Sequence, residues 1–216
     1  MSTSMINGSP LKSMLRFALP LLIGNLLQQT YNIIDAAIVG QTLGADALAS
    51  VGASSSVQFL VLGFCIGICA GFGIPVAKYF GAGDYHKMKQ YVYNGALLTA
   101  CAAAIVTAAC VLLCGWILRI LSVQPDIYGN AYAYLLIIFL GLPFTLMYNY
   151  LSSILRSVGD SRTPFIMNTC GLVSNVIADP LLIFGIGPFP ALGVAGAAVA
   201  TVFAQMFVFI LFIFAI

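Results

Sequence analysis

Two aspartates lie inside long apolar stretches of this chain. Asp35 falls in the stretch 17–77 and Asp179 in the stretch 163–216, and neither stretch contains a Lys or an Arg. On insertion scales, a charged side chain at the centre of a membrane helix costs roughly 2.5–3.5 kcal/mol. Two carboxylates close together cannot both stay charged there at low cost. The pattern therefore predicts a site that shares a proton, or a hard monovalent cation, between two acidic side chains.

Further polar residues accompany the two aspartates at helical spacing. Asp35 follows Arg16 by nineteen residues and Asp179 follows Arg162 by seventeen, so both carboxylates are expected at a similar depth in the membrane. Residues four apart share a helix face, and Thr201 is expected near the same depth. The predicted ion site consists of Asp35, Asn175, Asp179 and Thr201, and the predicted lining of the adjoining cavity consists of Gln28, Tyr31, Asn149 and Gln205.

The composition places these residues in a membrane protein. Of the 216 residues, 62% are hydrophobic and only 6% are charged, whereas a soluble domain carries about 25% charged residues. The net charge of +2 rests on eight scattered cations, too few for a nucleic-acid interface. Such a chain cannot cover itself with a polar surface, so we expect an integral membrane protein.

The cysteines indicate neither a metal site nor a disulfide framework. All six fall in apolar segments, and the only histidine, His86, lies in a polar loop away from them. Cysteine in such segments usually acts as a small hydrophobic residue at helix contacts. We therefore expect no resident metal and no cofactor; a Na⁺ ion at the acidic site is the one metal ion considered.

The charged residues divide the chain into helices. The stretches 90–118 and 127–155 hold 29 uncharged residues each, enough for one membrane span, while 17–77 and 163–216 are long enough for two spans with a turn. The apolar runs are continuous rather than alternating, so strands are not expected. The prediction is an all-α membrane protein with six transmembrane helices, at residues 14–40, 47–80, 89–118, 127–156, 162–186 and 191–216.

The basic residues predict the orientation. Seven of the eight Lys and Arg residues fall on one side of the six predicted spans, and only Arg119 falls on the other. By the positive-inside rule, both termini are cytoplasmic, with residues 1–13 forming a cytoplasmic segment before the bundle 14–216. We expect no cleavable signal peptide. Because the chain ends on the apolar run "FVFILFIFAI", we also expect that more protein follows it.

Prolines and Gly-Asp turns punctuate these helices. Pro20 and Pro143 are expected to kink their spans by removing a backbone hydrogen bond. The loops "FGAGDYHKMK" (80–89) and "RSVGDSR" (156–162) resemble each other, which hints at a repeated hairpin unit. Asp84 and Asp160 are interpreted as turn formers.

Four further segments form a distinctive combination: "LPLLIGNLLQQTYNIIDAAIVG" (19–40), "LRSVGDSRTP" (155–164), "SNVIADPLLIFG" (174–185) and "LGVAGAAVATVFAQ" (192–205). Together they resemble the multidrug and toxic compound extrusion (MATE) transporters, in particular their DinF-like branch. The resemblance implies one lobe of a twelve-helix transporter that exchanges H⁺ or Na⁺ for organic cations and other amphiphiles. By this resemblance the chain is the N-terminal six-helix lobe, and the C-terminal lobe is absent from it.

The resemblance also implies roles for the residues chosen above. Asp35, Asn175, Asp179 and Thr201 match the family's first-lobe cation site, while Gln28 and Tyr31 match residues that line the same cavity. Pro20 matches a first-helix proline whose bending is linked to protonation. The partners implied are an amphiphilic or cationic small molecule, the lipid bilayer, and the missing lobe or a second half-transporter. The place implied is the cytoplasmic membrane.

Two alternatives rank lower. A lipid-linked oligosaccharide flippase of the same superfamily tends to line its cavity with Arg or Lys, which this chain lacks inside its spans. An intramembrane aspartyl protease is suggested by "GAGD" (81–84), but Asp84 falls in a charged loop while Asp35 lies in the outer half of the bilayer. The two aspartates cannot meet there, so we do not expect an enzyme. Neither the exported compound nor the coupling ion is identified by the sequence.

Overall fold

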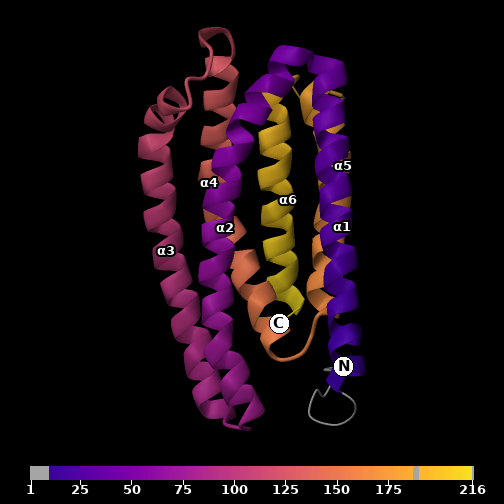
Figure 1. Ribbon diagram of the computed structural model, residues 1–216, viewed down its shortest axis with the longest axis vertical. Helices are drawn as coiled ribbons and strands as arrows, with labels where there is room; N and C mark the ends of the chain where they lie inside the picture. The colour runs from indigo at the N-terminus through magenta and orange to yellow at the C-terminus, as the bar shows by residue number, and fades with distance from the viewer. Residues whose placement is uncertain (1–9, 187–189, 216) are drawn as a thin grey trace.

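Six long helices make up the fold. A computed structural model describes residues 10–186 and 190–215, except for some side chains of the first helix and that of Ala215. The helices follow one another with short connections (Figure 1). Their bounds are α1 Pro10–Leu43, α2 Ala45–Gly81, α3 Tyr85–Ile120, α4 Pro125–Ser157, α5 Arg162–Phe184 and α6 Val194–Ala215.

The predicted all-α architecture is confirmed for the described residues. Each helix lies where the charge pattern placed it, with bounds that differ from the prediction by at most four residues. By length and composition, α2 to α6 are apolar enough to cross a membrane. α1 is 34 residues long, but Asn25, Gln28 and Gln29 interrupt its apolar run. Its mean hydropathy is therefore too low for α1 to be identified as a membrane span by length and composition.

α4 lies at the centre of the packing. It contacts α2, α3 and α6, while α1 packs against α2 and α5, and α5 packs against α6. Figure 1 shows α3 on the outside of one flank, and α1 with α5 on the other flank. The bundle therefore has a core built around α4, with α3 as a peripheral helix.

α2 and α4 run in the same direction and meet through small residues. The Ser50 hydroxyl donates to the Ile127 carbonyl at 3.4 Å, and the Cys69 thiol donates to the Leu146 carbonyl at 3.4 Å. Both pairs are separated by 77 positions, as expected for parallel helices in constant register. Small side chains let the backbones approach closely, which is how membrane helices commonly associate.

The cysteines take part in this packing. Cys65, Cys69, Cys110 and Cys114 are buried free thiols, as expected of small core residues. Cys101 and Cys170 are free thiols too, but they are exposed, so the expectation of a place at helix contacts is wrong for these two. Among the residues described here, no three His, Cys, Asp or Glu side chains gather in a way that suits a metal ion.

The two Gly-Asp loops have the same hydrogen-bond pattern. In the first, Gly83 has a φ of 72° and the Asp84 N–H donates back to the Tyr79 carbonyl. In the second, Gly159 has a φ of 84° and the Asp160 N–H donates to the Leu155 carbonyl. A bond from residue i to i−5 beside a left-handed glycine is a Schellman helix end. The similarity seen in the sequence thus corresponds to a shared turn geometry.

Each aspartate then caps the helix that follows. The Asp84 carboxylate accepts from the Lys87 N–H at 3.1 Å, and the Asp160 carboxylate accepts from the N–H groups of Arg162 and Thr163 at 3.0 and 3.1 Å. The Thr163 hydroxyl also donates to Asp160 at 2.6 Å. Partial burial opposes the charge of Asp160, but these hydrogen bonds outweigh it and hold its pKa below the ordinary value of 3.8. Turn formation accounts for both aspartates.

The basic residues gather at one end of the bundle. Figure 1 shows that the start of α1, the end of α6 and both Gly-Asp turns lie at the same end. The turns carry Lys78, Lys87, Lys89, Arg156 and Arg162 near them, while Arg119 ends α3 at the opposite end. This arrangement agrees with the separation of basic residues that the sequence predicts.

The prolines do not interrupt the helices. α1 is continuous through Pro20 and α4 is continuous through Pro143, although each proline removes a backbone donor.

The backbones of α5 and α6 approach each other closely at Gly196, where an added Cβ would come within 2.5 Å of the Leu182 carbonyl oxygen. That neighbour is backbone, so it cannot move aside as a flexible side chain does.

We predict that Gly196→Ala destabilises the protein by about 1–3 kcal/mol, because the added methyl group overpacks the α5–α6 contact. The matched control is Gly63→Ala on α2, where a Cβ meets no atom within 4 Å. It is expected to leave the stability unchanged or to raise it slightly. Thermal unfolding in detergent measures both; equal stabilities of the two variants would contradict the close approach.

We also predict that Asp160→Ala destabilises the protein at pH 7 by about 0.5–2 kcal/mol, the usual worth of a cap. The folded pKa of Asp160 is lowered, so its contribution is present above the ordinary value of 3.8 and is lost as the pH falls through the folded pKa. Unfolding curves should therefore converge at low pH. Asp160→Asn, which keeps one acceptor oxygen, should show a smaller difference at pH 7 that also decreases as the pH falls, because both variants lack the titrating carboxylate. A constant gap for the alanine variant would oppose this account.

Candidate functional site

The predicted acidic site is built on a buried carboxylate of α5. Asp179 is 1% exposed and Asn175 is 4% exposed. The Asn175 amide donates to a carboxylate oxygen of Asp179 at 3.4 Å, one helical turn away. A buried carboxylate needs charge-stabilising partners, and the amide orients toward it as the predicted spacing requires. These two predicted site residues are therefore brought together by the structure.

The first helix runs beside α5 in matching register. Val39 and Ile183 are both buried in one core cluster, and Gly24 lies against the Phe165 ring lower down the same pair of helices. One turn before Val39 on α1 is Asp35, and one turn before Ile183 on α5 is Asp179. The backbone thus places the two aspartates at a similar level. The side chains of Asp35 and Tyr31 lie outside the described part of the structure.

α6 brings Thr201 to the same level. It packs against α5 in the opposite direction, with Gly196 near Leu182 and Gly171 near Val208. That register sets Thr201 opposite residues 177–178, within one turn of Asp179. The Thr201 hydroxyl donates to the Ala197 carbonyl of its own helix at 3.0 Å. Its proton is therefore engaged, and its oxygen lone pairs are the groups that it can offer to a cation.

A second cluster of hydrogen-bonded polar residues connects α4 to α6. The Thr145 hydroxyl, 3% exposed, donates to the side-chain oxygen of Gln205, and the Asn149 amide donates to the Thr145 carbonyl at 2.8 Å. The sequence analysis named Asn149 and Gln205 but missed Thr145, which connects them. Its position four residues before Asn149 is the signal that identifies it.

The remaining predicted residues lie on or near α1. Gln28 is exposed on its helix, so in this single lobe it does not line an enclosed cavity. Pro20 lines a groove of about 340 Å³ between α1 and α5. The groove is apolar except for one cation at its edge; it is lined by Leu19, Pro20, Ile23, Arg162, Phe165 and Ile166.

The site offers oxygen ligands and few other groups. Carboxylate, amide and hydroxyl oxygens are the ligands that hard cations prefer, and a carboxylate is also a proton acceptor. Such a set is chemically suited to hold a proton or an alkali cation.

Comparison with known proteins gives a consistent picture. The MatE family model matches residues 20–181. The chain is 32% identical to the "Probable multidrug resistance protein YoeA" of Bacillus subtilis, over 92% of this chain and 43% of that protein. It is 31% identical to an "FAD transporter" of Shewanella oneidensis, over 89% of this chain and 42% of that one. The chain therefore spans about half the length of these curated relatives.

Solved structures share the fold. A MATE structure described as being in the bent conformation has a TM-score of 0.87 and 25% identity, and the match covers 99% of this chain and 47% of that chain. Another, described as being in the straight conformation, has a TM-score of 0.88, 24% identity and the same coverage. The lobe described here therefore corresponds to one half of a twelve-helix transporter fold.

We predict that Thr145→Val destabilises the protein by about 1–3 kcal/mol, because the Gln205 oxygen loses its donor inside the bundle. Thr169→Val serves as the control, since the Thr169 hydroxyl donates only to the Phe165 carbonyl of its own helix. Its effect should be well below that of Thr145→Val. Thermal unfolding of both variants in detergent decides the point, and a loss in the control as large as that in Thr145→Val would argue against the α4–α6 link.

Proposed function

Because the chain belongs to the MatE family, we propose that it forms the N-terminal lobe of an exporter that expels organic cations or other amphiphilic compounds in exchange for H⁺ or Na⁺. It is a multi-pass membrane protein with five helices apolar enough to span a bilayer among its described residues. Transport rather than covalent chemistry is the activity of this family, so we assign no catalytic residue.

The observation that carries the proposal is the burial of Asp179. A carboxylate that is 1% exposed on a membrane-spanning helix is expensive to keep unless it serves a function. Asn175 bonds to it directly, and the helix registers bring the backbones of Asp35 and Thr201 to its level. Intramembrane carboxylates with oxygen-bearing neighbours are suited to bind and release a proton or a small cation.

Ion exchange at this site would change the shape of the lobe through α1. Binding of one H⁺ or Na⁺ reduces the negative charge of the acidic pair by one unit and weakens the repulsion between α1 and α5, while release restores it. Pro20 lacks a backbone donor and borders the 340 Å³ groove between these helices, so α1 has both a weak point and room to bend there. The bent and straight forms of solved MATE structures support this two-state view.

The substrate path requires a second lobe. The chain corresponds to about half the length of its relatives, so we place drug binding between this lobe and a second six-helix unit, in the same protein or in a partner. Gln28, Tyr31, Asn149 and Gln205 are proposed to line this lobe's side of the cavity. The names of the relatives, multidrug resistance protein and FAD transporter, support an amphiphilic aromatic substrate.

We place the lobe in the cytoplasmic membrane with its basic end in the cytoplasm. Lys78, Lys87, Lys89, Arg156 and Arg162 lie at the end that carries both Gly-Asp turns, and such a bias normally marks the cytoplasmic side. Accessibility labelling of single cysteines introduced at the two ends tests this orientation.

The ion site is tested by Asp35→Asn and Asp179→Asn. We expect each variant to lose at least tenfold in ethidium efflux from everted vesicles with an imposed proton or sodium gradient, because the neutral amide cannot exchange the coupling ion. Asp46→Asn is the matched control, since Asp46 is exposed in the first turn of α2. It should transport as well as the unchanged protein.

A direct binding measurement accompanies the transport assay. The unchanged protein should bind radioactive Na⁺ or take up a proton at this site on acid titration. That signal should be lost in the Asp179→Asn variant and retained in the Asp46→Asn variant. Full efflux by the two site variants would refute the proposal. Loss of efflux with ion binding unchanged would place the function of Asp179 elsewhere in the transport cycle and refute its role as the ion ligand.

A further inference from the structure

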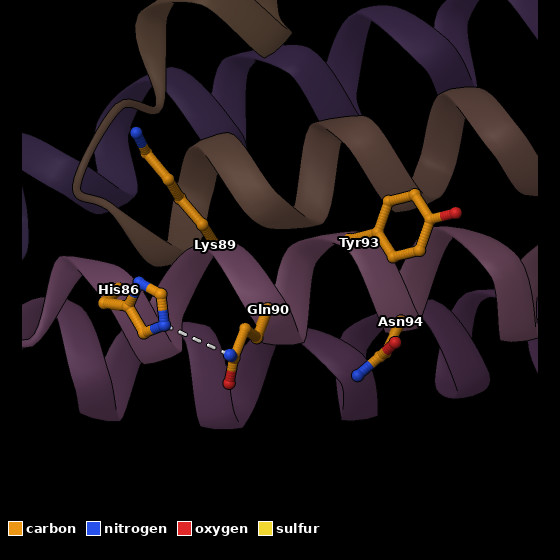
Figure 2. A pocket seen from close by; sticks show the side chains of 5 residues that line it. All are labelled: His86, Lys89, Gln90, Tyr93 and Asn94. Carbon is orange, nitrogen blue, oxygen red and sulfur yellow. Dashed lines mark hydrogen bonds between the residues drawn. The ribbon is translucent and has the colours of Figure 1, made fainter.

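One face of α3 carries polar side chains at the basic end of the bundle. Five residues share this face because each lies three or four positions from another member of the set along the helix. They border an open, shallow hollow of about 520 Å³ and are His86, Lys89, Gln90, Tyr93 and Asn94. In Figure 2, Lys89 and Tyr93 stand along one edge of this face, and His86, Gln90 and Asn94 stand along the other. The His86 ring nitrogen and the Gln90 amide nitrogen are 3.2 Å apart. We call these five residues the α3 polar face.

The two lysines of this segment have different surroundings. Lys87 forms an ion pair with Asp84 at 3.3 Å and lies 5.7 Å from the centre of the Tyr79 ring. Lys89 is exposed and forms no ion pair with any residue that the structure describes. The charge of Lys87 is therefore committed to the turn, whereas that of Lys89 is available to an anion from outside.

The polar face lies where lipid headgroups are expected. α3 is 36 residues long, or about 54 Å at about 1.5 Å per residue, whereas the hydrocarbon core of a bilayer is about 30 Å thick. The excess length must lie in the headgroup layers. The residues from Gly95 to Leu118 contain no charge, so the polar face occupies the interface at the basic end, where tyrosines such as Tyr93 are also favoured.

An apolar track continues from the polar face along the same helix. Leu97, Cys101 and Ile105 follow Tyr93 at intervals of four residues, and all of them are exposed. Because α3 packs mainly against α2 and α4 and these three side chains are exposed, this track faces outward from the lobe. A ligand that fits both parts has an anionic, hydroxyl-bearing head and a long apolar tail.

We propose that the α3 polar face binds the headgroup of an anionic phospholipid such as phosphatidylglycerol, with an acyl chain along Leu97, Cys101 and Ile105. The Lys89 ammonium pairs with the phosphodiester, and the amides of Gln90 and Asn94 bond to the glycerol hydroxyls. This site is separate from the proposed ion site and does not depend on the transport proposal.

The test compares two lysines that lie two residues apart. The intact protein is purified in a nonionic detergent and titrated with dioleoylphosphatidylglycerol or dioleoylphosphatidylcholine, and bound lipids are counted by native mass spectrometry. We expect the unchanged protein to prefer phosphatidylglycerol about fivefold, as one basic side chain near a membrane surface provides. Lys89→Gln should abolish this preference, whereas Lys87→Gln, which removes the same charge, should retain it.

Three outcomes overturn the assignment. Preference unchanged in the Lys89→Gln variant shows that Lys89 does not hold the headgroup. An equal loss in both lysine variants shows that overall charge, rather than this face, attracts the lipid. Displacement of phosphatidylglycerol by millimolar inorganic phosphate shows that the ligand is a free anion and not a lipid. Thermal unfolding of the two variants, which alter exposed side chains, confirms that each is folded during the titration.

Discussion

The structure depends on one constraint, which is that a lipid bilayer offers no hydrogen-bond partner to a buried polar group. Helices meet this constraint by pairing most of their backbone groups within themselves, and many side chains are satisfied in the same way. The hydroxyls of Ser54 and Thr99 donate to carbonyls one turn earlier in their own helices, as does the amide of Asn149. Asp179 cannot be satisfied in this way, because an ionised carboxylate has no proton to donate to a carbonyl. It needs a donor or a cation instead, and the Asn175 amide one turn earlier is one such donor. The proposal of an ion site rests on this need.

Much of the fold was predictable because charge and hydropathy act along the chain. Charged residues cannot enter the hydrocarbon cheaply, so the gaps between them fixed the helix positions to within one turn. Glycine and aspartate marked the turns for local reasons that need no tertiary information. The charge pattern predicted α1 in spite of its polar residues. These residues lower its mean hydropathy, so composition alone does not identify α1 as a span.

The contacts between helices were harder to predict from the sequence. The spacing of Asn175 and Asp179 predicted that they share one face of a helix, where the structure shows a hydrogen bond between them. The bond between Thr145 and Gln205 was missed, since it joins residues 60 positions apart and depends on the register of α4 against α6. That register is set by the close approach of Gly141 to Val202, which no periodicity within one helix reveals. Spacing along one helix therefore predicted which residues share a helix face, but not which residues meet across helices.

The parallel pairing of α2 with α4 has a consequence for biosynthesis. Ser50 and Cys69 meet carbonyls that lie 77 positions later in the chain. At about 5–20 residues per second, a ribosome needs roughly 4–15 s to make that intervening length. During this delay the face of α2 that contacts α4 lies in the membrane without α4. The Ser50 hydroxyl already donates to the Asp46 carbonyl at 2.8 Å within α2, so this hydroxyl is satisfied before α4 is made. The Cys69 thiol is only a weak donor, so the absence of the Leu146 carbonyl during this delay costs little.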